Sequence, residues 1–160
     1  MTICAKDREC LFGDIFDGKM RLSAVGLMLH GTWNDISVKN PGVEIDEFIV
    51  MPNHVHGIIV IVWAQFIASS GMIALNRDGA MEKGAINRAP TGGEITRAFK
   101  VRCTNAINEI CKTQGSPIWQ RNYYEHFIRD EDDLDRIHKY IIENQLKWVG
   151  DGDNPTNNIP

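Results

Sequence analysis

Runs of hydrophobic residues predict two neighbouring strands in the middle of the chain. Residues 43–50 alternate apolar and acidic side chains before becoming fully apolar, and residues 54–63 are apolar at most positions after two histidines. The turn Met51-Pro52-Asn53 between them is short, which predicts an antiparallel hairpin. Because the second strand is apolar on both faces, we expect it to be central and covered on both sides. Residues 2–4 and 11–16 form two weaker extended segments.

Helical spacing of apolar residues predicts three helices around this hairpin. Ser23 can N-cap a first helix that runs towards Trp33. Residues 94–112 place apolar side chains at near-helical spacing and basic side chains on other faces, which predicts an amphipathic helix. Asp130 can N-cap a third helix, whose inward apolar stripe extends to about Leu146.

Two further segments have very different patterns. Residues 64–93 scatter serine, glycine and proline without sustained periodicity, which predicts a long, flexible surface loop. Residues 118–128 carry six aromatic or β-branched side chains, which favours a strand. With no internal repeat, the 160 residues predict one domain over residues 1–150 and a C-terminal tail over residues 151–160.

Charge and composition limit the class of protein. The net charge of −4 counts against strong non-specific binding to nucleic acid, because phosphate neutralisation usually leaves a domain basic. The charges are uneven, however: residues 83–102 hold five basic residues and one acid, whereas residues 130–135 hold five acids. No apolar run approaches the ~18 residues that a membrane span needs, and the N-terminus lacks a signal-peptide core. We therefore expect a cytoplasmic protein without a membrane segment.

The cysteines and three of the five histidines show no metal-binding spacing. The cysteines lack a C-x-x-C motif, so we expect free, mostly buried thiols at Cys4, Cys10, Cys103 and Cys111. We expect ordinary surface or hydrogen-bonded histidines at His30, His126 and His138.

The other two histidines stand at the start of the predicted central strand. Residues two apart on a strand point to the same face, so His54 and His56 present their imidazoles side by side. Such a pair can share one divalent metal ion, at a rigid position beside a turn that admits substrate. Two hydrogen-bonded histidines at a strand end are the alternative reading.

The last predicted helix carries a second pair of polar side chains. Tyr140 and Asn144 are four residues apart and therefore share a helix face. The Asn144 amide oxygen can bind a cation, and a deprotonated Tyr140 can attack a phosphodiester to give a phosphotyrosine. Tyr123 and Tyr124 are rival nucleophiles, although we expect one to be core and the other to stack on bases.

Three ordered motifs resemble those of the single-tyrosine HUH transposases, and most closely those of the REP-associated tyrosine transposases. They are Met51-Pro52-Asn53-His54-Val55-His56-Gly57, Ile118-Trp119-Gln120-Arg121-Asn122-Tyr123-Tyr124-Glu125-His126 and Tyr140-Ile141-Ile142-Glu143-Asn144. The resemblance runs from about Thr2 to Trp148, interrupted by residues 64–93. It implies an α+β fold with a ferredoxin-like antiparallel sheet and helices packed on it, the HUH endonuclease core. It also implies that His54, His56 and Asn144 bind Mg²⁺ or Mn²⁺ and that Tyr140 is the nucleophile.

The activity that the resemblance implies is metal-dependent cleavage and rejoining of single-stranded or hairpin DNA through a 5′-phosphotyrosine intermediate. Family members are usually homodimers, in which the tyrosine helix of one subunit can complete the partner's site. Candidate phosphate contacts are the basic side chains of Arg97, Lys100, Arg102, Arg121 and Arg129. Two other functions stay open: a hairpin-binding regulator that has lost transposition, and a metal-dependent phosphodiester hydrolase that activates water.

The chain departs from the family pattern in three respects. It begins almost at the first strand, where relatives often carry a basic segment, so we expect part of the DNA-binding surface to be missing. Gln145 stands where many relatives have proline after the asparagine. Because Gln145 is five residues after Tyr140, it lies about 100° further round the helix than Asn144, which we prefer as ligand. The third departure is the acidic net charge.

Overall fold

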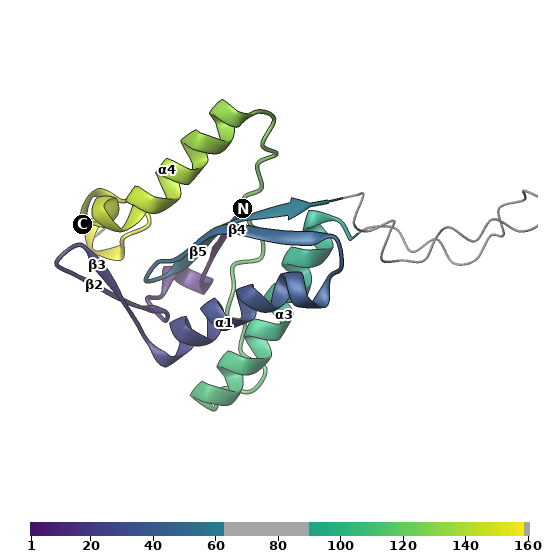
Figure 1. Cartoon of the computed structure of the whole chain (residues 1–160). Coiled ribbons are helices and arrows are strands. Elements are labelled where there is room, and N and C mark those ends of the chain that lie inside the picture. Colours follow the sequence, from purple (N-terminus) through teal and green to yellow (C-terminus); the bar gives the residue numbers. More distant parts are fainter. Residues whose placement is uncertain (63–89, 159–160) are drawn as a thin grey trace, which may run out of the picture.

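A three-stranded antiparallel sheet forms the centre of the computed structural model, which describes residues 1–62 and 90–158 (Figure 1). The sheet has the strand order β1-β5-β4, and its strands are β1 (Thr2–Cys4), β4 (Val43–Val50) and β5 (His54–Ile61). A separate two-stranded hairpin consists of β2 (Gly13–Phe16) and β3 (Lys19–Leu22). The predicted hairpin and the central position of its second strand are both confirmed.

Helices cover both faces of this sheet. α1 (Ala24–Lys39) and α3 (Gly92–Cys111) pack together on one face, and α4 (Glu131–Lys147) lies on the other (Figure 1). Short 3-10 turns occur at Lys6–Arg8, Trp148–Gly150 and Pro155–Asn158. The architecture is α+β with helices packed on an antiparallel sheet, as expected. Within the described ranges, no helix is long and apolar enough to cross a membrane.

The N-terminus of α3 lies two residues earlier than predicted. Thr91 and Glu94 form a capping box, in which each side chain accepts a hydrogen bond from the other residue's backbone N–H. Residues 92–93, which were predicted to be loop, are therefore helical. Residues 64–89 of the predicted loop lie outside the described residues. The side-chain caps predicted for α1 and α4 are both present.

Residues 118–128 do not form a strand, and this prediction was wrong. The segment makes two isolated bridges to the N-terminal region, from Trp119 to Ala5 and from Tyr124 to Thr2. Its neighbour β1 is only three residues long, which leaves little backbone for a continuous ladder. The apolar composition has another cause, because Trp119 is buried in the main core.

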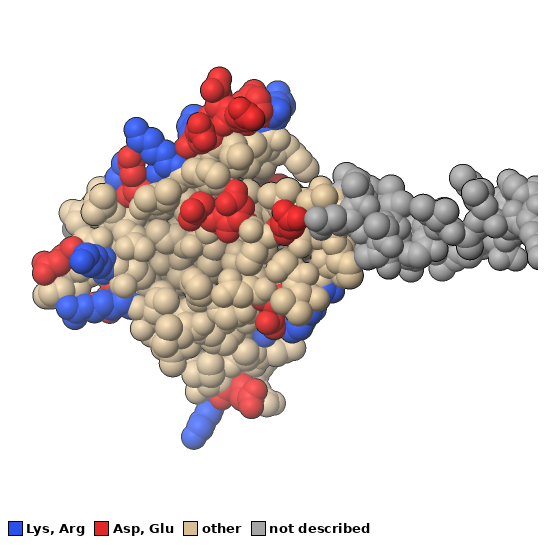
Figure 2. Space-filling view, viewed as in Figure 1, with Lys and Arg blue, Asp and Glu red and all other residues tan. Residues whose placement is uncertain are grey.

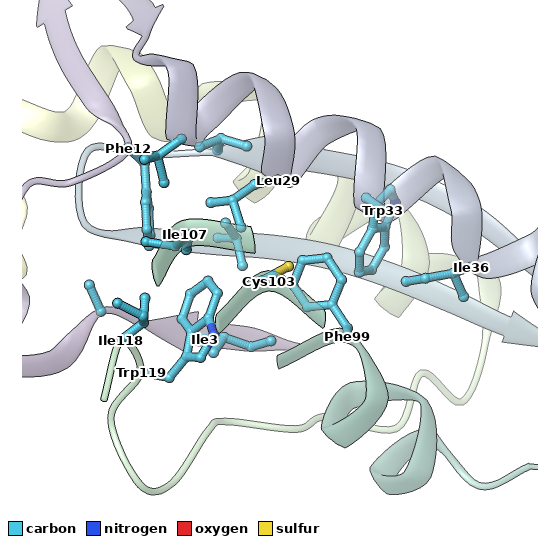
Figure 3. Packing of buried hydrophobic residues seen from close by; sticks show 14 of the residues in the cluster. Ile3, Phe12, Leu29, Trp33, Ile36, Phe99, Cys103, Ile107, Ile118 and Trp119 are labelled. Carbon is cyan, nitrogen blue, oxygen red and sulfur yellow. The ribbon is translucent and has the colours of Figure 1, made fainter. Parts of the chain in front are cut away.

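The main core lies between the sheet and the helix pair α1 and α3 (Figure 3). Trp33 stacks on Phe48 with ring centroids 4.4 Å apart, and Phe99 meets Trp33 edge-on at 5.7 Å. Val101 and Ile110 are apolar residues of α3 that lie outside its buried stripe and are exposed. The stripe comprises Ile95, Phe99, Cys103 and Ile107.

All four cysteines are free, as predicted, but their burial differs from the expectation. Cys103 is buried and Cys4 is partly buried, whereas Cys10 and Cys111 are exposed. Cys111 is the last residue of α3, and Cys10 follows the first 3-10 turn. Their positions at element ends keep both thiols out of the core.

A smaller cluster joins α4 to the opposite face of the sheet. Its buried members are Ile49, Met51, Ile58, Ile141 and Trp148. Because His54, His56 and Ile58 alternate along β5 on one face, the histidine face of the strand lies beneath α4.

Gly57, which follows the second histidine, is required by close packing. A Cβ at this position would lie 2.4 Å from Cη2 and 2.5 Å from Cζ2 of the buried Trp33 ring. We expect Gly57→Ala to lower the free energy of unfolding by about 1–3 kcal/mol, because the stacked indole has no free space to move into. Urea denaturation followed by tryptophan fluorescence measures this change.

Gly31→Ala is the matched control for this prediction. A Cβ at Gly31, on α1, would meet nothing within 4 Å, and alanine favours a helix over glycine by about 0.5–1 kcal/mol. Gly31→Ala should therefore stabilise the protein. A Gly57→Ala protein as stable as the wild type would contradict the packing argument.

Candidate functional site

His54 and His56 face each other beneath α4. Their Nε2 atoms are 3.0 Å apart, their rings are nearly perpendicular, and both side chains are buried. The two residues lie where β5 is hydrogen-bonded to β1 on one side, so the backbone that carries them is rigid. The structure thus places the two imidazoles so that the Nε2 atom of each ring faces the Nε2 atom of the other.

The other nitrogen of each ring is held from behind by a polar side chain. His54 Nδ1 lies 2.8 Å from Asn53 Oδ1, and His56 Nδ1 lies 2.8 Å from Thr2 Oγ1. Metal-binding imidazoles in proteins are commonly held in this way, with one nitrogen hydrogen-bonded and the other directed to the ion. The geometry therefore favours a metal-binding pair over two unrelated histidines at a strand end, because both Nδ1 atoms have side-chain partners and both Nε2 atoms point to one place.

Burial keeps both rings neutral. It lowers the pKa of His54 to about 4, although the nearby Asp151 carboxylate acts in the opposite direction. Burial also lowers the pKa of His56 to about 3, with a further contribution from His54. At neutral pH both imidazoles therefore have the uncharged form that binds metal ions.

Helix α4 places two more predicted residues over this pair. The buried Asn144 has its Nδ2 atom 3.3 Å from His56 Nε2. The Tyr140 ring lies edge-on to the His56 ring, with centroids 5.2 Å apart, and 49% of the tyrosine is exposed. Gln145 is turned elsewhere, since its Oε1 accepts a hydrogen bond from the Met20 N–H at 3.1 Å. The structure thus brings together Tyr140, His54, His56 and Asn144.

The donor set around this point fits a divalent cation. Asn144 Oδ1 is buried and has no hydrogen-bond partner within the described part of the chain. A half-turn of the amide would exchange Oδ1 with Nδ2 and direct the oxygen at the histidine pair. The two Nε2 atoms are 3.0 Å apart, so His54, His56 and Asn144 could hold one ion together.

Carboxylates and thiols do not complete this donor set. Among residues 1–62 and 90–158, no group of three or more His, Cys, Asp or Glu side chains is arranged to hold a metal ion. The third protein donor available to the histidine pair is therefore the Asn144 amide. Two imidazole nitrogens and one amide oxygen can bind Mg²⁺ or Mn²⁺. This donor set discriminates less strongly against other divalent metal ions than a set of carboxylates would.

Sequence reasoning missed the residues that support the histidines. Asn53 is buried, and its Nδ2 donates to the backbone oxygens of Arg8 at 3.0 Å and Asp153 at 2.7 Å. The segment after α4, which was predicted to be a tail, thus packs against the turn before β5. Asn53 was visible in the sequence, but an asparagine in a turn is ordinarily assigned to the turn itself.

The predicted DNA-contact residues do not converge on the histidine pair. Lys100 is partly buried and donates to the Gln120 carbonyl at 2.8 Å, so its ammonium is already engaged. Arg97 and Arg102 are exposed on α3, which covers the opposite face of the sheet. Arg121 and Arg129 are also exposed.

Acidic residues gather at the N-terminal end of α4 (Figure 2). They are Asp130, Glu131, Asp132, Asp133 and Asp135. Asp133 is paired with His126 at 2.7 Å and with Arg136, which removes part of its charge from the surface. This end of α4 is therefore acidic.

The other candidate tyrosines and histidines have different partners. The Tyr123 hydroxyl donates to Glu125 Oε2 at 3.3 Å, and Tyr124 is 65% exposed. His126 and His138 are hydrogen-bonded to carboxylates, each at 2.7 Å, and His30 is exposed. These three histidines are surface or hydrogen-bonded residues, as their spacing suggested.

A largely apolar cavity of about 820 Å³ opens beside Tyr140. The rings of His56 and Tyr140 line part of its wall, and residues 124–128 line another part. Two of these residues, Tyr124 and Phe127, are 65% and 77% exposed. The candidate site therefore combines buried polar donors with an open apolar surface that carries aromatic side chains.

Comparisons with known proteins identify relatives of the chain and a shared fold. No protein-family model matches the chain. An uncharacterised protein of Haemophilus influenzae is 38% identical over 151 residues, which cover 94% of this chain and 81% of that protein. A solved structure of a REP-associated tyrosine transposase bound to a REP hairpin aligns with 91% of the chain at a TM-score of 0.53 and 19% identity. The chain belongs to the family of the Haemophilus protein and has the REP-associated tyrosine transposase fold.

A second Haemophilus influenzae protein supports the resemblance to the REP-associated tyrosine transposases. It carries that name provisionally and is 36% identical over 63 residues, 39% of this chain and 36% of that protein. The chain spans 64% of the solved transposase, somewhat less than two thirds of its length. At 19% identity this alignment establishes the shared fold, whereas the roles of individual residues rest on the geometry of this chain.

Proposed function

We propose that the protein is a metal-dependent transposase or endonuclease that cleaves and rejoins single-stranded DNA through a 5′-phosphotyrosine intermediate. One observation carries the proposal: a half-exposed tyrosine, Tyr140, lies against His56, and Asn144 on the same helix reaches the same ring. A nucleophile, two imidazoles and an amide oxygen at one point can together carry out metal-assisted cleavage of a phosphodiester. The hairpin bound to the solved transposase supports hairpin DNA as the partner here.

The metal would be held by His54, His56 and Asn144. When bound, Mg²⁺ or Mn²⁺ supplies the positive charge that stabilises the negative charge developing on the scissile phosphate. Thr2 and Asn53 keep the two imidazoles in place from behind. The exposure of Tyr140 leaves its hydroxyl open to a DNA strand.

The chain's own chemical step is an attack by the Tyr140 oxygen on phosphorus. As the bond from this oxygen to phosphorus forms, the tyrosine loses its proton and the bond to the 3′ oxygen breaks. That oxygen takes up a proton and leaves as a 3′-hydroxyl, while the 5′-phosphate stays on Tyr140. Attack by a 3′-hydroxyl later reverses these steps. The tyrosine ester retains the bond energy, so the reaction needs no nucleotide cofactor.

A homodimer is not required by this arrangement, because Tyr140 and His56 of one chain already meet. Because this contact forms within one chain, we propose a site that works in cis, and we expect the activity per subunit to be independent of protein concentration. Exchange of α4 between two subunits would instead make the activity depend on protein concentration.

The cavity beside Tyr140 supports a single-stranded substrate. Unpaired bases expose apolar faces that stack on aromatic side chains, and Phe127 lies exposed at this cavity. We expect Phe127→Ala to weaken binding of single-stranded DNA about 5- to 150-fold, because one stacked base contributes about 1–3 kcal/mol. Fluorescence anisotropy at fixed salt concentration measures this affinity.

Phe16→Ala is the control for this experiment, since Phe16 is 51% exposed but lies on the separate β2–β3 hairpin. It should bind DNA as the wild type does, and Phe127→Tyr should retain most of the affinity because it keeps an aromatic ring. Equal affinities for Phe127→Ala and wild type would remove the cavity from the DNA path.

A covalent-trapping experiment tests the proposed function. The wild-type protein is incubated with end-labelled hairpin DNA and Mn²⁺ and then separated under denaturing conditions. A labelled adduct that survives denaturation supports the transposase reaction. Cleavage without an adduct would indicate a phosphodiester hydrolase, and binding without cleavage would indicate a regulator.

A further inference from the structure

The two side chains behind the histidines differ in hydrogen-bonding capacity. The Asn53 oxygen can only accept a hydrogen bond, whereas the Thr2 hydroxyl can both donate and accept. Asn53 cannot turn its amide over without loss, because its Nδ2 already donates to the carbonyls of Arg8 and Asp153. Each histidine is therefore supported by a group of a different kind.

The Asn53 oxygen determines the tautomer of His54. Because Asn53 Oδ1 is an acceptor at 2.8 Å, the proton of the neutral His54 ring must be on Nδ1. The Nε2 atom of His54 then presents a lone pair towards His56 Nε2, 3.0 Å away.

The tautomer of His56 is free to change. Without a metal ion, the contact between the two Nε2 atoms is a hydrogen bond only if His56 carries its proton on Nε2. The Nδ1 atom of His56 then accepts the Thr2 hydroxyl proton at 2.8 Å. When both Nε2 atoms bind an ion, the His56 proton must be on Nδ1, and the Thr2 oxygen becomes the acceptor.

A competing arrangement uses the Asn144 amide. Its Nδ2 lies 3.3 Å from His56 Nε2 and could donate to it, which would put the His56 proton on Nδ1 even without metal. That arrangement sets two lone pairs against each other at 3.0 Å and fixes the amide with Asn144 Oδ1 unpaired. Both consequences are unfavourable in a buried site. With the proton on His56 Nε2, a half-turn of the amide instead directs Oδ1, an acceptor, at that N–H.

We propose that Thr2 is a positioning residue of the metal site, whose hydroxyl changes from donor to acceptor as His56 changes tautomer on metal binding. This inference rests on the proposed metal site. The number of protons on the protein is unchanged, because one proton leaves Nε2 and one is held on Nδ1 of the same ring. The hydroxyl keeps a buried ring nitrogen paired in both states.

Two variants of Thr2 test the proposal. Thr2→Val keeps the shape and the strand propensity but has no hydroxyl, whereas Thr2→Ser keeps the hydroxyl. Loss of such a supporting hydrogen bond weakens metal binding typically 10- to 100-fold, so we expect this increase in the Mn²⁺ Kd of Thr2→Val. Thr2→Ser should bind Mn²⁺ nearly as the wild type does. Isothermal titration calorimetry with Mn²⁺ alone, without DNA, gives the affinities.

Nitrogen NMR of the wild-type protein reads the tautomers directly. We expect His54 to be protonated on Nδ1 throughout, and His56 to be protonated on Nε2 without metal and on Nδ1 with diamagnetic Mg²⁺. A metal-free His56 protonated on Nδ1, or a Thr2→Val protein with wild-type affinity, would overturn the proposal. If the wild type binds no divalent ion, the proposed metal dependence is wrong. The spectrum of the metal-free protein still tests separately whether His56 carries its proton on Nε2.

Discussion

Tyr140→Phe is expected to form no covalent adduct with hairpin DNA, a loss of at least ~1000-fold relative to wild type. The variant lacks only the attacking oxygen. Its ring can keep the edge-on contact with His56, and Tyr140 is half-exposed, so the fold should be unaffected. We expect wild-type affinity for Mn²⁺ and for DNA. Denaturing gels, calorimetry and anisotropy measure the three properties separately.

Tyr123→Phe and Tyr124→Phe are the controls, because they remove the same atom from the other tyrosines of the chain. Both should form the adduct, although Tyr124→Phe can alter DNA affinity because Tyr124 lines the cavity. If Tyr140→Phe still forms the adduct and one of the other two variants does not, the nucleophile has been misassigned. If all three form it, the covalent bond is made elsewhere in the protein.

Short-range periodicity predicted which side chains of the candidate site share a face. The spacing of two on a strand put His54 and His56 on one face, and the spacing of four on a helix put Tyr140 and Asn144 on another. The same helical geometry separates Asn144 from Gln145, which bonds to the backbone of Met20. The periodicity of a strand or helix determines which side chains point in the same direction. The apolar residues on both faces of residues 54–63 indicated that this strand would be central.

Contacts between distant segments were beyond the reach of this reasoning. Asn53 bonds to Asp153, one hundred residues away, and Thr2 meets His56 across two strands whose register no local pattern specifies. The aromatic segment 118–128 misled the strand prediction because burial of Trp119 and a regular ladder leave the same composition. The amino-acid composition of a segment indicates that it is buried. Whether it also forms a strand depends on the length of the neighbouring strand with which it could pair.

His56→Ala is expected to abolish measurable Mn²⁺ binding, with a Kd at least ~100-fold higher than that of wild type, and to abolish the adduct as a consequence. The removed ring supplies one ligand and is also the group that Asn144 and Tyr140 contact. In wild-type protein, chelation with EDTA should also abolish the adduct, and added Mn²⁺ should restore it. Calorimetry and the trapping gel measure both effects.

Stability measurements separate loss of a ligand from loss of the fold. His56→Ala leaves buried polar partners unpaired, and we expect it to lower the free energy of unfolding by about 1–3 kcal/mol. Metal at about one hundred times its Kd stabilises a folded protein by about 2.7 kcal/mol, so Mn²⁺ should raise the Tm of wild type and leave that of His56→Ala unchanged. His30→Ala, which removes an exposed histidine, should respond to Mn²⁺ as wild type does. An equal Mn²⁺-dependent rise in His56→Ala would place the ion away from the histidine pair, whatever the result for Tyr140.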